Sequence, residues 1–79
     1  MSIKLIKLSE VLQQVPYSKS LIYVHIKQKL FPSQISLGAR AVAFVYSEIQ
    51  EVLKARITGK TDDEIRKLVI SLEADRREI

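Results

Sequence analysis

The fold of this chain is decided by residues 31–49, Phe31-Pro-Ser-Gln-Ile-Ser-Leu-Gly-Ala-Arg-Ala-Val-Ala-Phe-Val-Tyr-Ser-Glu-Ile49. Two short apolar runs flank the turn Gly38-Ala-Arg40, and glycine supplies the positive φ angle that such turns often need. We therefore expect a hairpin over residues 34–45. Its strands should cover 34–37 and 41–45, with Arg40 at the apex and Phe44 in the core.

Helix signals follow the hairpin. Ser47-Glu-Ile-Gln50 has the spacing of a capping box, and Gly59 is a typical C-terminal stop. Between them, apolar residues recur at helical spacing: Ile49, Val52, Leu53 and Ile57. Thr61-Asp-Asp-Glu64 is a second capping box, and it opens a last helix that we expect to fray over residues 74–78. The apolar positions of this helix are Ile65, Leu68, Val69 and Leu72.

The residues before the hairpin predict a short strand and two helices. Residues 3–8 alternate like an edge strand, and Ser9 is a good N-cap for a helix that Pro16 ends. Ser18 is a good N-cap for a second helix over about 19–29, which Phe31-Pro32 ends. The link between the two helices is about three to four residues long, as in helix-turn-helix units. The residues of this part that we expect in the core are Val11, Leu12, Val15, Leu30 and Phe31.

The helix over 19–29 has two faces. Ile22 and Ile26 lie on the side that should anchor it in the core. The other side and the first turn hold groups that can bond phosphates or base edges, or meet a thymine methyl group. With the hairpin apex, they form the candidate DNA-contacting set: Ser18, Lys19, Ser20, Tyr23, Val24, Lys27 and Arg40. The structural alternative is that the serines cap the helix, the cations are solvated and Tyr23 packs on the hairpin.

Charge is unevenly distributed along the 79 residues, whose net charge is +4. Residues 1–40 hold six basic side chains and one acidic side chain, a net charge of +5. Residues 41–79 hold seven basic and eight acidic side chains, a net charge of −1. A basic segment of this kind attracts a phosphate backbone, although ordinary solubility charge is the alternative.

No catalytic, metal or cofactor site is expected. The chain has no cysteine, and the single His25 cannot build an imidazole metal site by itself. Ser18 and Ser20 have no supporting acid near His25 in the sequence, and no glycine-rich phosphate loop is present. We expect His25 to be partly buried and hydrogen-bonded to the backbone. No apolar run approaches the ~20 residues that span a bilayer, and no signal-peptide core is present, so we expect a cytoplasmic protein without enzymatic activity.

Taken together, these residues resemble the AlpA-like prophage regulators, a family related to excisionases and to MerR-type winged helix-turn-helix proteins. The resemblance covers about residues 5–58. It rests on Leu5-Ile-Lys-Leu-Ser-Glu-Val11, Ser18-Lys-Ser20 with Ile22-Tyr23, Phe31-Pro32, Leu37-Gly-Ala-Arg-Ala-Val42 and Ser47-Glu-Ile49. It implies a bacterial or phage-encoded DNA-binding protein that acts as a transcriptional regulator or as an architectural excision factor. It also implies that Ser18, Lys19, Ser20 and Tyr23 lie in a recognition helix and Arg40 in a wing.

The chain departs from this family pattern at two positions of the helix over 19–29. The family often has a small hydroxyl residue where Leu21 stands and an arginine where Val24 stands. We therefore expect a DNA sequence preference that differs from the usual one.

The expected fold is α+β and mostly helical: a winged helix-turn-helix with a two-stranded hairpin wing and two C-terminal helices. Residues 1–59 would form the DNA-binding domain, and residues 60–79 a C-terminal helical extension packed on the same domain. The leading functional prediction is a sequence-specific DNA-binding transcriptional regulator of prophage or mobile-element type. It would place the helix over 19–29 in the major groove of double-stranded DNA and the hairpin over 34–45 beside it, alone or as a homo-oligomer. The alternative is an excisionase-like architectural factor or a module that binds a recombinase, an integrase or a response regulator.

Overall fold

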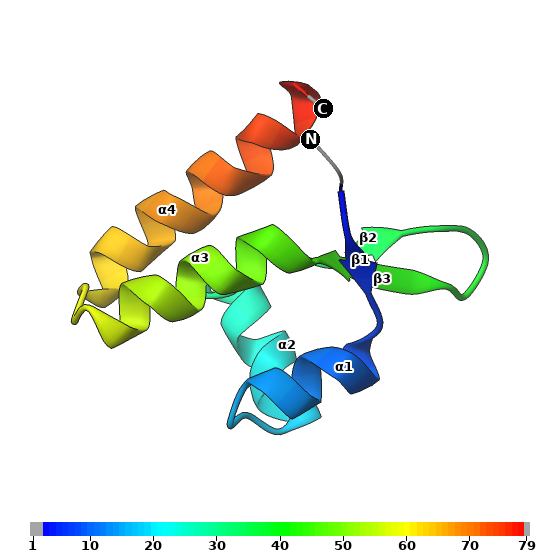
Figure 1. Ribbon diagram of the computed structural model, residues 1–79, viewed down its shortest axis with the longest axis horizontal. Helices are drawn as coiled ribbons and strands as arrows, with labels where there is room; N and C mark the ends of the chain where they lie inside the picture. The colour runs from blue at the N-terminus through cyan, green and yellow to red at the C-terminus, as the bar shows by residue number, and fades with distance from the viewer. Residues whose placement is uncertain (1–2, 79) are drawn as a thin grey trace.

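A computed structural model describes residues 3–78 and shows an α+β fold in which helices predominate, as expected (Figure 1). The elements follow one another as β1 (Leu5–Ile6), α1 (Leu8–Gln14), α2 (Lys19–Lys27), β2 (Ile35–Ser36), β3 (Val42–Val45), α3 (Tyr46–Ile57) and α4 (Asp62–Asp75). A short 3-10 helix (Arg76–Glu78) continues from α4.

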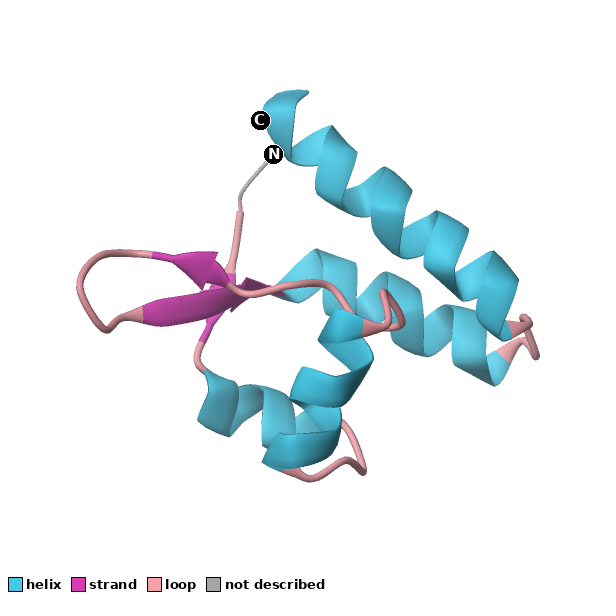
Figure 2. Cartoon of the chain, turned by 180° about the vertical axis from the view of Figure 1, so that it is seen from behind, coloured by secondary structure: helices cyan, strands magenta, loops and turns pink. Residues whose placement is uncertain are grey.

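The three strands form one small antiparallel sheet in the order β1-β3-β2. Leu5 lies opposite Val45, and Ile35 lies opposite Ala43. The predicted edge strand and hairpin are therefore both present. The Leu37 N–H donates to the Ala41 carbonyl at 2.8 Å and closes the turn, in which Gly38 has a φ angle of 142° that disfavours other residues. Figures 1 and 2 show the hairpin extending beyond the rest of the molecule.

The first core cluster joins α1, α2, the sheet and the start of α3. Phe44, which the sequence predicts to be buried, is fully enclosed, and its ring meets the edge of Phe31 at a centroid distance of 6.1 Å. The buried members of this cluster are Ile6, Val11, Val15, Ile22, Phe31, Phe44 and Ile49.

The second core cluster lies between α3 and α4, which are close together at the loop that joins them and diverge toward their other ends (Figures 1 and 2). Its buried members are Leu30, Val52, Ala55, Ile65 and Val69. Leu68 and Leu72 pack partly buried against it. The apolar stripe predicted for the last helix therefore faces α3 and Leu30.

Two predicted helix starts are confirmed and two are wrong. Ser18 caps α2 by accepting from the Leu21 N–H at 3.2 Å, and Thr61 and Glu64 form both bonds of a capping box on α4. Neither Ser9 nor Ser47 is an N-cap. α1 and α3 each begin two residues earlier than predicted: their N-caps are Lys7 and Val45, and neither has a side-chain capping bond.

The reason is the direct junction between strand and helix. β3 runs without a break into α3, and the Tyr46 N–H donates to the Lys4 carbonyl at 2.9 Å. The sheet therefore satisfies a helix-start donor that a capping side chain would otherwise serve. Only Lys7 separates β1 from α1, so the helix has already begun at Ser9.

The end of α2 also differs from the prediction. The helix ends at Lys27, well before Phe31-Pro32, because Lys29 adopts a left-handed φ angle of 63°. The Leu30 N–H donates to the His25 carbonyl and the Lys29 N–H to the Ile26 carbonyl, which is a Schellman motif. Gly59 closes α3 in the same way, as its sequence predicts.

Two further expectations for the C-terminal half are wrong. Ile57 lies at an apolar position of α3 but is 84% exposed, because it is in the last turn, beyond the contact with α4. Residues 74–78 do not fray: α4 continues to Asp75, and Arg76 forms an ion pair with Glu48.

Candidate nucleic-acid interface

α2 turns one side into the core and the other to the surface. Ile22 is completely buried, and Ser18 holds the start of the helix in place. Lys19, Ser20 and Lys27 are exposed, and Tyr23 and Val24 keep 36% and 47% of their surface. The structure therefore brings all six candidate residues of 18–27 to the surface of this short helix, as a mixture of hydroxyl, cationic and apolar groups.

Two of these residues bear on the structural alternative. The Ser18 hydroxyl accepts the helix-capping bond, so Ser18 has a structural role whatever else it contacts. Tyr23 belongs to neither core cluster, whereas Tyr17 and Tyr46 pack against the first one. Packing in the core therefore does not account for Tyr23.

The hairpin turn presents Arg40 to solvent. Residues 36–42 are all exposed, and Arg40 makes no ion pair within residues 3–78. Two apolar residues beside the turn, Leu37 and Val42, are 55% and 38% exposed. The candidate DNA-contacting set predicted from the sequence does not include Leu37 and Val42. Their position next to the exposed glycine turn is the sequence feature that could have indicated their exposure.

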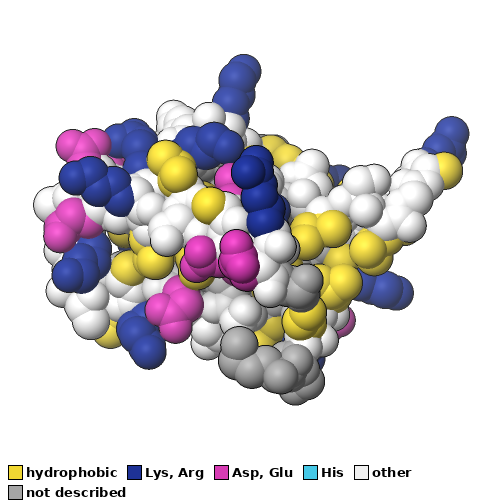
Figure 3. All heavy atoms as spheres, turned by 90° about the horizontal axis from the view of Figure 1, so that it is seen from above, with side chains coloured by type: hydrophobic (Ala, Val, Ile, Leu, Met, Phe, Trp, Pro, Cys, Tyr) yellow, Lys and Arg dark blue, Asp and Glu magenta, His cyan; other side chains and the backbone are white. Residues whose placement is uncertain are grey.

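Ion pairs divide the molecule into two parts. All five ion pairs among residues 3–78 include at least one side chain from residues 60–78. Lys19, Lys27 and Arg40 take part in none of them, and Lys4 instead lies over the Tyr46 ring at 4.9 Å. Figure 3 shows acidic and basic side chains intermixed over the α3–α4 side and the hairpin projecting from the other. The cations of α2 and the hairpin therefore remain available to an external anion.

His25 is partly buried, as expected, but the expected backbone hydrogen bond is absent. Its Nδ1 is buried without a partner among the described residues, and its ring meets the edge of Tyr17 at 5.0 Å. Burial, and secondarily the charge of Arg56, lowers the pKa of His25 and so favours the neutral form of the ring. The ring of His25 lies against the Tyr17 ring, and no hydrogen bond from the described residues reaches its Nδ1.

Within residues 3–78, no three acidic or histidine side chains gather in a way that could hold a metal ion. In the same part of the chain, no helix has the length and apolarity required to cross a membrane.

The fold and this surface define a small basic α+β protein with a solvent-facing helix and a projecting hairpin. Residues 4–57 match the model of the family described as prophage CP4-57 regulatory protein (AlpA). A protein of Enterobacteria phage P4, named uncharacterized protein ORF88, is 35% identical over 57 residues, which cover 72% of this chain. The chain spans 65% of the length of that relative. No solved structure matches the chain.

The chain therefore belongs to the AlpA family of prophage regulatory proteins. The family match runs from just before β1 to the end of α3 and leaves α4 outside it.

Proposed function

We propose that this protein is a sequence-specific DNA-binding transcriptional regulator of a prophage or mobile element. In this proposal the fold acts as a winged helix-turn-helix: α2 enters the major groove and the β2–β3 hairpin lies beside it as the wing. The observation that supports it best is the set of unpaired cations on α2 and the hairpin, in a chain whose family is one of prophage regulators. Lysine and arginine side chains that are free of internal partners can replace the counterions of a phosphate backbone.

Each candidate residue has a role that follows from its chemistry. Lys19, at the start of α2, and Lys27, at its end, would bind phosphates and orient the helix. Ser20 and Tyr23 would donate to phosphate or base edges, and Val24 would contact a thymine methyl group. Arg40 would enter a narrow minor groove, where the negative potential attracts arginine. Ser18 would add a phosphate contact through its hydroxyl proton, which the capping bond leaves unused.

Salt-dependent binding to duplex DNA tests the proposal. The probe is the DNA that flanks the gene for this protein, footprinted and titrated from low to physiological salt. We expect the double variant Lys19→Ala/Arg40→Ala to bind at least about tenfold more weakly at low salt and to reduce the slope of log K against log salt by about two.

The matched control removes two exposed cations elsewhere, as Lys54→Ala/Arg77→Ala. It lowers the net charge equally but should change binding much less. Equal losses in the two variants would show that only overall charge attracts DNA, and would contradict the proposed surface.

A second function is favoured by the apolar residues that α2 exposes. Leu21 and Val24 keep 38% and 47% of their surface, which also suits a protein partner such as a recombinase or another regulator in an excision complex. Val24→Lys distinguishes the two: it would abolish capture of an integrase encoded beside the gene while strengthening non-specific duplex binding. The spacing of footprinted half-sites would then report whether copies associate on DNA.

A further inference from the structure

The connection between α2 and β2, residues 28–34, is held at both ends by side chains of the C-terminal segment. Its second residue, Lys29, has a left-handed backbone conformation that is unfavourable for a residue with a side chain. The connection continues through Leu30, Phe31 and Pro32, all of them buried, and emerges at Ser33. This connection joins the helix and the hairpin that we propose to contact DNA.

Three side chains from the C-terminal segment bind this connection. The Arg66 Nε donates to the Gln28 carbonyl at 3.1 Å, and Glu73 accepts from the Ser33 N–H at 2.8 Å. Arg76 donates to the Ser33 carbonyl at 2.8 Å and to its hydroxyl at 3.3 Å. The spacings of seven and three residues place Arg66, Glu73 and Arg76 on one side of a helix. Arg66 and Glu73 belong to α4 and Arg76 to the 3-10 helix that follows it, and we call these three residues the C-terminal clamp.

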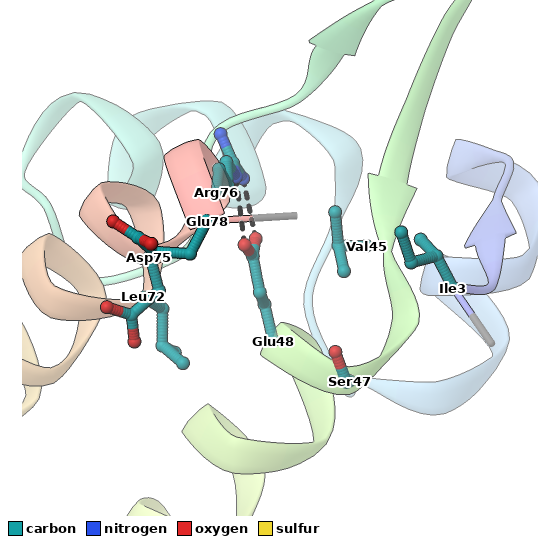
Figure 4. Close-up of a pocket in the computed structure, with 8 residues that line it drawn as sticks. All are labelled: Ile3, Val45, Ser47, Glu48, Leu72, Asp75, Arg76 and Glu78. Atoms are coloured by element: carbon teal, nitrogen blue, oxygen red, sulfur yellow. Dashed lines mark hydrogen bonds and ion pairs between the residues drawn. The ribbon is translucent and has the colours of Figure 1, made fainter. Parts of the chain in front are cut away.

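Arg76 is itself anchored to the start of α3. It donates to both carboxylate oxygens of Glu48, at 2.8 and 2.6 Å, and Glu48 is only 4% exposed. Figure 4 shows this two-point contact at the edge of a cavity of about 710 Å³, between the sheet and the C-terminal turn. A two-point arginine–carboxylate contact fixes direction as well as distance. Arg76 therefore connects α3, which follows directly from β3, with Ser33, which precedes β2.

We propose that Arg76 and Glu73 are positioning residues for the DNA-contacting surface. By holding Ser33 against the start of α3, they fix how the hairpin is oriented relative to α2. The inference rests on the proposed function, because it concerns the surface that would meet DNA. It also assigns a role to the segment beyond the family match, since Glu73 and Arg76 lie after residue 57.

Amide hydrogen exchange without DNA tests the clamp directly. In Glu73→Ala and Arg76→Ala, we expect exchange at the Ser33 and Leu37 amides to rise by about tenfold or more, because the connection opens locally. The Val52 amide of α3 should be unaffected at temperatures well below unfolding. Arg77→Ala removes the same charge from an adjacent exposed position and should leave all three amides unchanged.

Duplex affinity then tests the consequence. Arg76→Ala should weaken binding by about tenfold, and Arg40→Ala should cost less in that background than in the wild type, because a misplaced wing has already lost its contact. Arg76→Lys should restore little, since a lysine cannot make the two-point contact. Glu73→Ala leaves the Arg76–Glu48 pair intact and serves if Arg76→Ala does not fold.

The outcomes separate this inference from the proposed function. A wild-type chain that binds no duplex overturns the proposed function and the positioning role with it. A chain that binds duplex, while its clamp variants keep wild-type exchange at Ser33 and Leu37, overturns the positioning role alone. Additive effects of Arg76→Ala and Arg40→Ala on affinity would also overturn the positioning role. Additivity would mean that Arg40 keeps its full contact with DNA when Arg76 is absent.

Discussion

The two halves of this small protein use their charged side chains in opposite ways. In the half made of α1, α2 and the hairpin, Lys19, Lys27 and Arg40 have no acidic partner among the described residues. In the half made of α3, α4 and the final turn, Arg56, Lys60, Arg66 and Arg76 each pair with an acid, and the Arg76–Glu48 pair is mostly buried. The three cations of α2 and the hairpin are therefore available for an external partner, whereas most cations of the second half stabilise the chain through ion pairs.

The family match covers the first half together with α3. The matched region, residues 4–57, includes the whole surface proposed to meet DNA. α4 lies outside it and contributes buried apolar residues, together with polar contacts to the connection that joins α2 and β2. A domain this small buries only roughly 60% of its unfolded surface, so additional burial from α4 is a substantial gain.

The largest expected effect tests whether α4 is integral to the fold. Ile65 is fully buried in the second cluster, and Ile65→Ala should lower the free energy of unfolding by about 3 kcal/mol through lost burial and a cavity. Ile70→Ala, on the same helix but 55% exposed, should change it by less than about 0.5 kcal/mol. Urea denaturation followed by circular dichroism measures both. Similar effects of the two variants would contradict the packing of α4 on α3.

A smaller effect separates a structural serine from a surface serine on α2. Ser18→Ala removes the N-cap and should lower the free energy of unfolding by about 1 kcal/mol, whereas Ser20→Ala should leave it nearly unchanged. In duplex titrations, Ser20→Ala should weaken binding more than Ser18→Ala does. The Ser20 hydroxyl makes no capping bond and is free to contact DNA. If Ser20→Ala destabilises the chain as much as Ser18→Ala, the assignment of the cap is wrong.

Substitution of Lys29, the left-handed residue at the end of α2, should have two opposing effects on stability. Lys29→Gly relieves backbone strain of about 1 kcal/mol. It also removes the exposed ion pair with Glu73, whose contribution is at most about 1 kcal/mol and typically a few tenths. We therefore expect a small net increase in thermal stability, measured by calorimetry. A decrease would show that the Lys29–Glu73 pair contributes more than an exposed pair usually does.

The smallest expected effects appear as pH dependence. Burial raises the pKa of Glu73, but hydrogen bonds from Ser33 and the charge of Lys29 lower it by more, so it lies below its ordinary value. The stability that the Glu73 carboxylate contributes is fully present at a pH above its ordinary pKa. It is lost as the pH falls through the lowered pKa of the folded chain. The melting temperature of Glu73→Gln should therefore fall less than that of the wild type on acidification. An identical acid response would contradict the role of the Glu73 carboxylate.

His25 should contribute to the pH dependence of stability at a higher pH than Glu73 does. Because its pKa in the folded chain lies below the ordinary value of 6.5, its contribution to stability is present above 6.5 and is lost as the pH falls through the lowered pKa. His25→Phe retains an aromatic ring beside Tyr17 and should remove this part of the pH dependence of the melting temperature. A wild-type response in that variant would indicate that His25 is solvated in the folded chain.

Sequence reasoning succeeded where the signal was local. The turn at Gly38, the caps at Ser18 and Thr61, the stop at Gly59 and the apolar stripe of α4 all depend on residues a few positions apart. It failed where a distant strand satisfied a local need, as at Ser47, or where a non-glycine residue adopted a left-handed conformation, as at Lys29. It predicted neither the orphaned Nδ1 of His25 nor the anchoring of Arg76.

The amino-acid sequence alone was sufficient for the α+β class, the order of the elements and the surface exposure of the candidate DNA-contacting residues, because periodicity and turn chemistry act over short distances. The tertiary structure was needed to show that Glu48, Ser33 and Arg76 meet, since they are separated by 15 to 43 positions in the chain. It was also needed to show which cations are paired internally and which are available. Ion pairing depends on positions in space, and no local pattern in the sequence determines them.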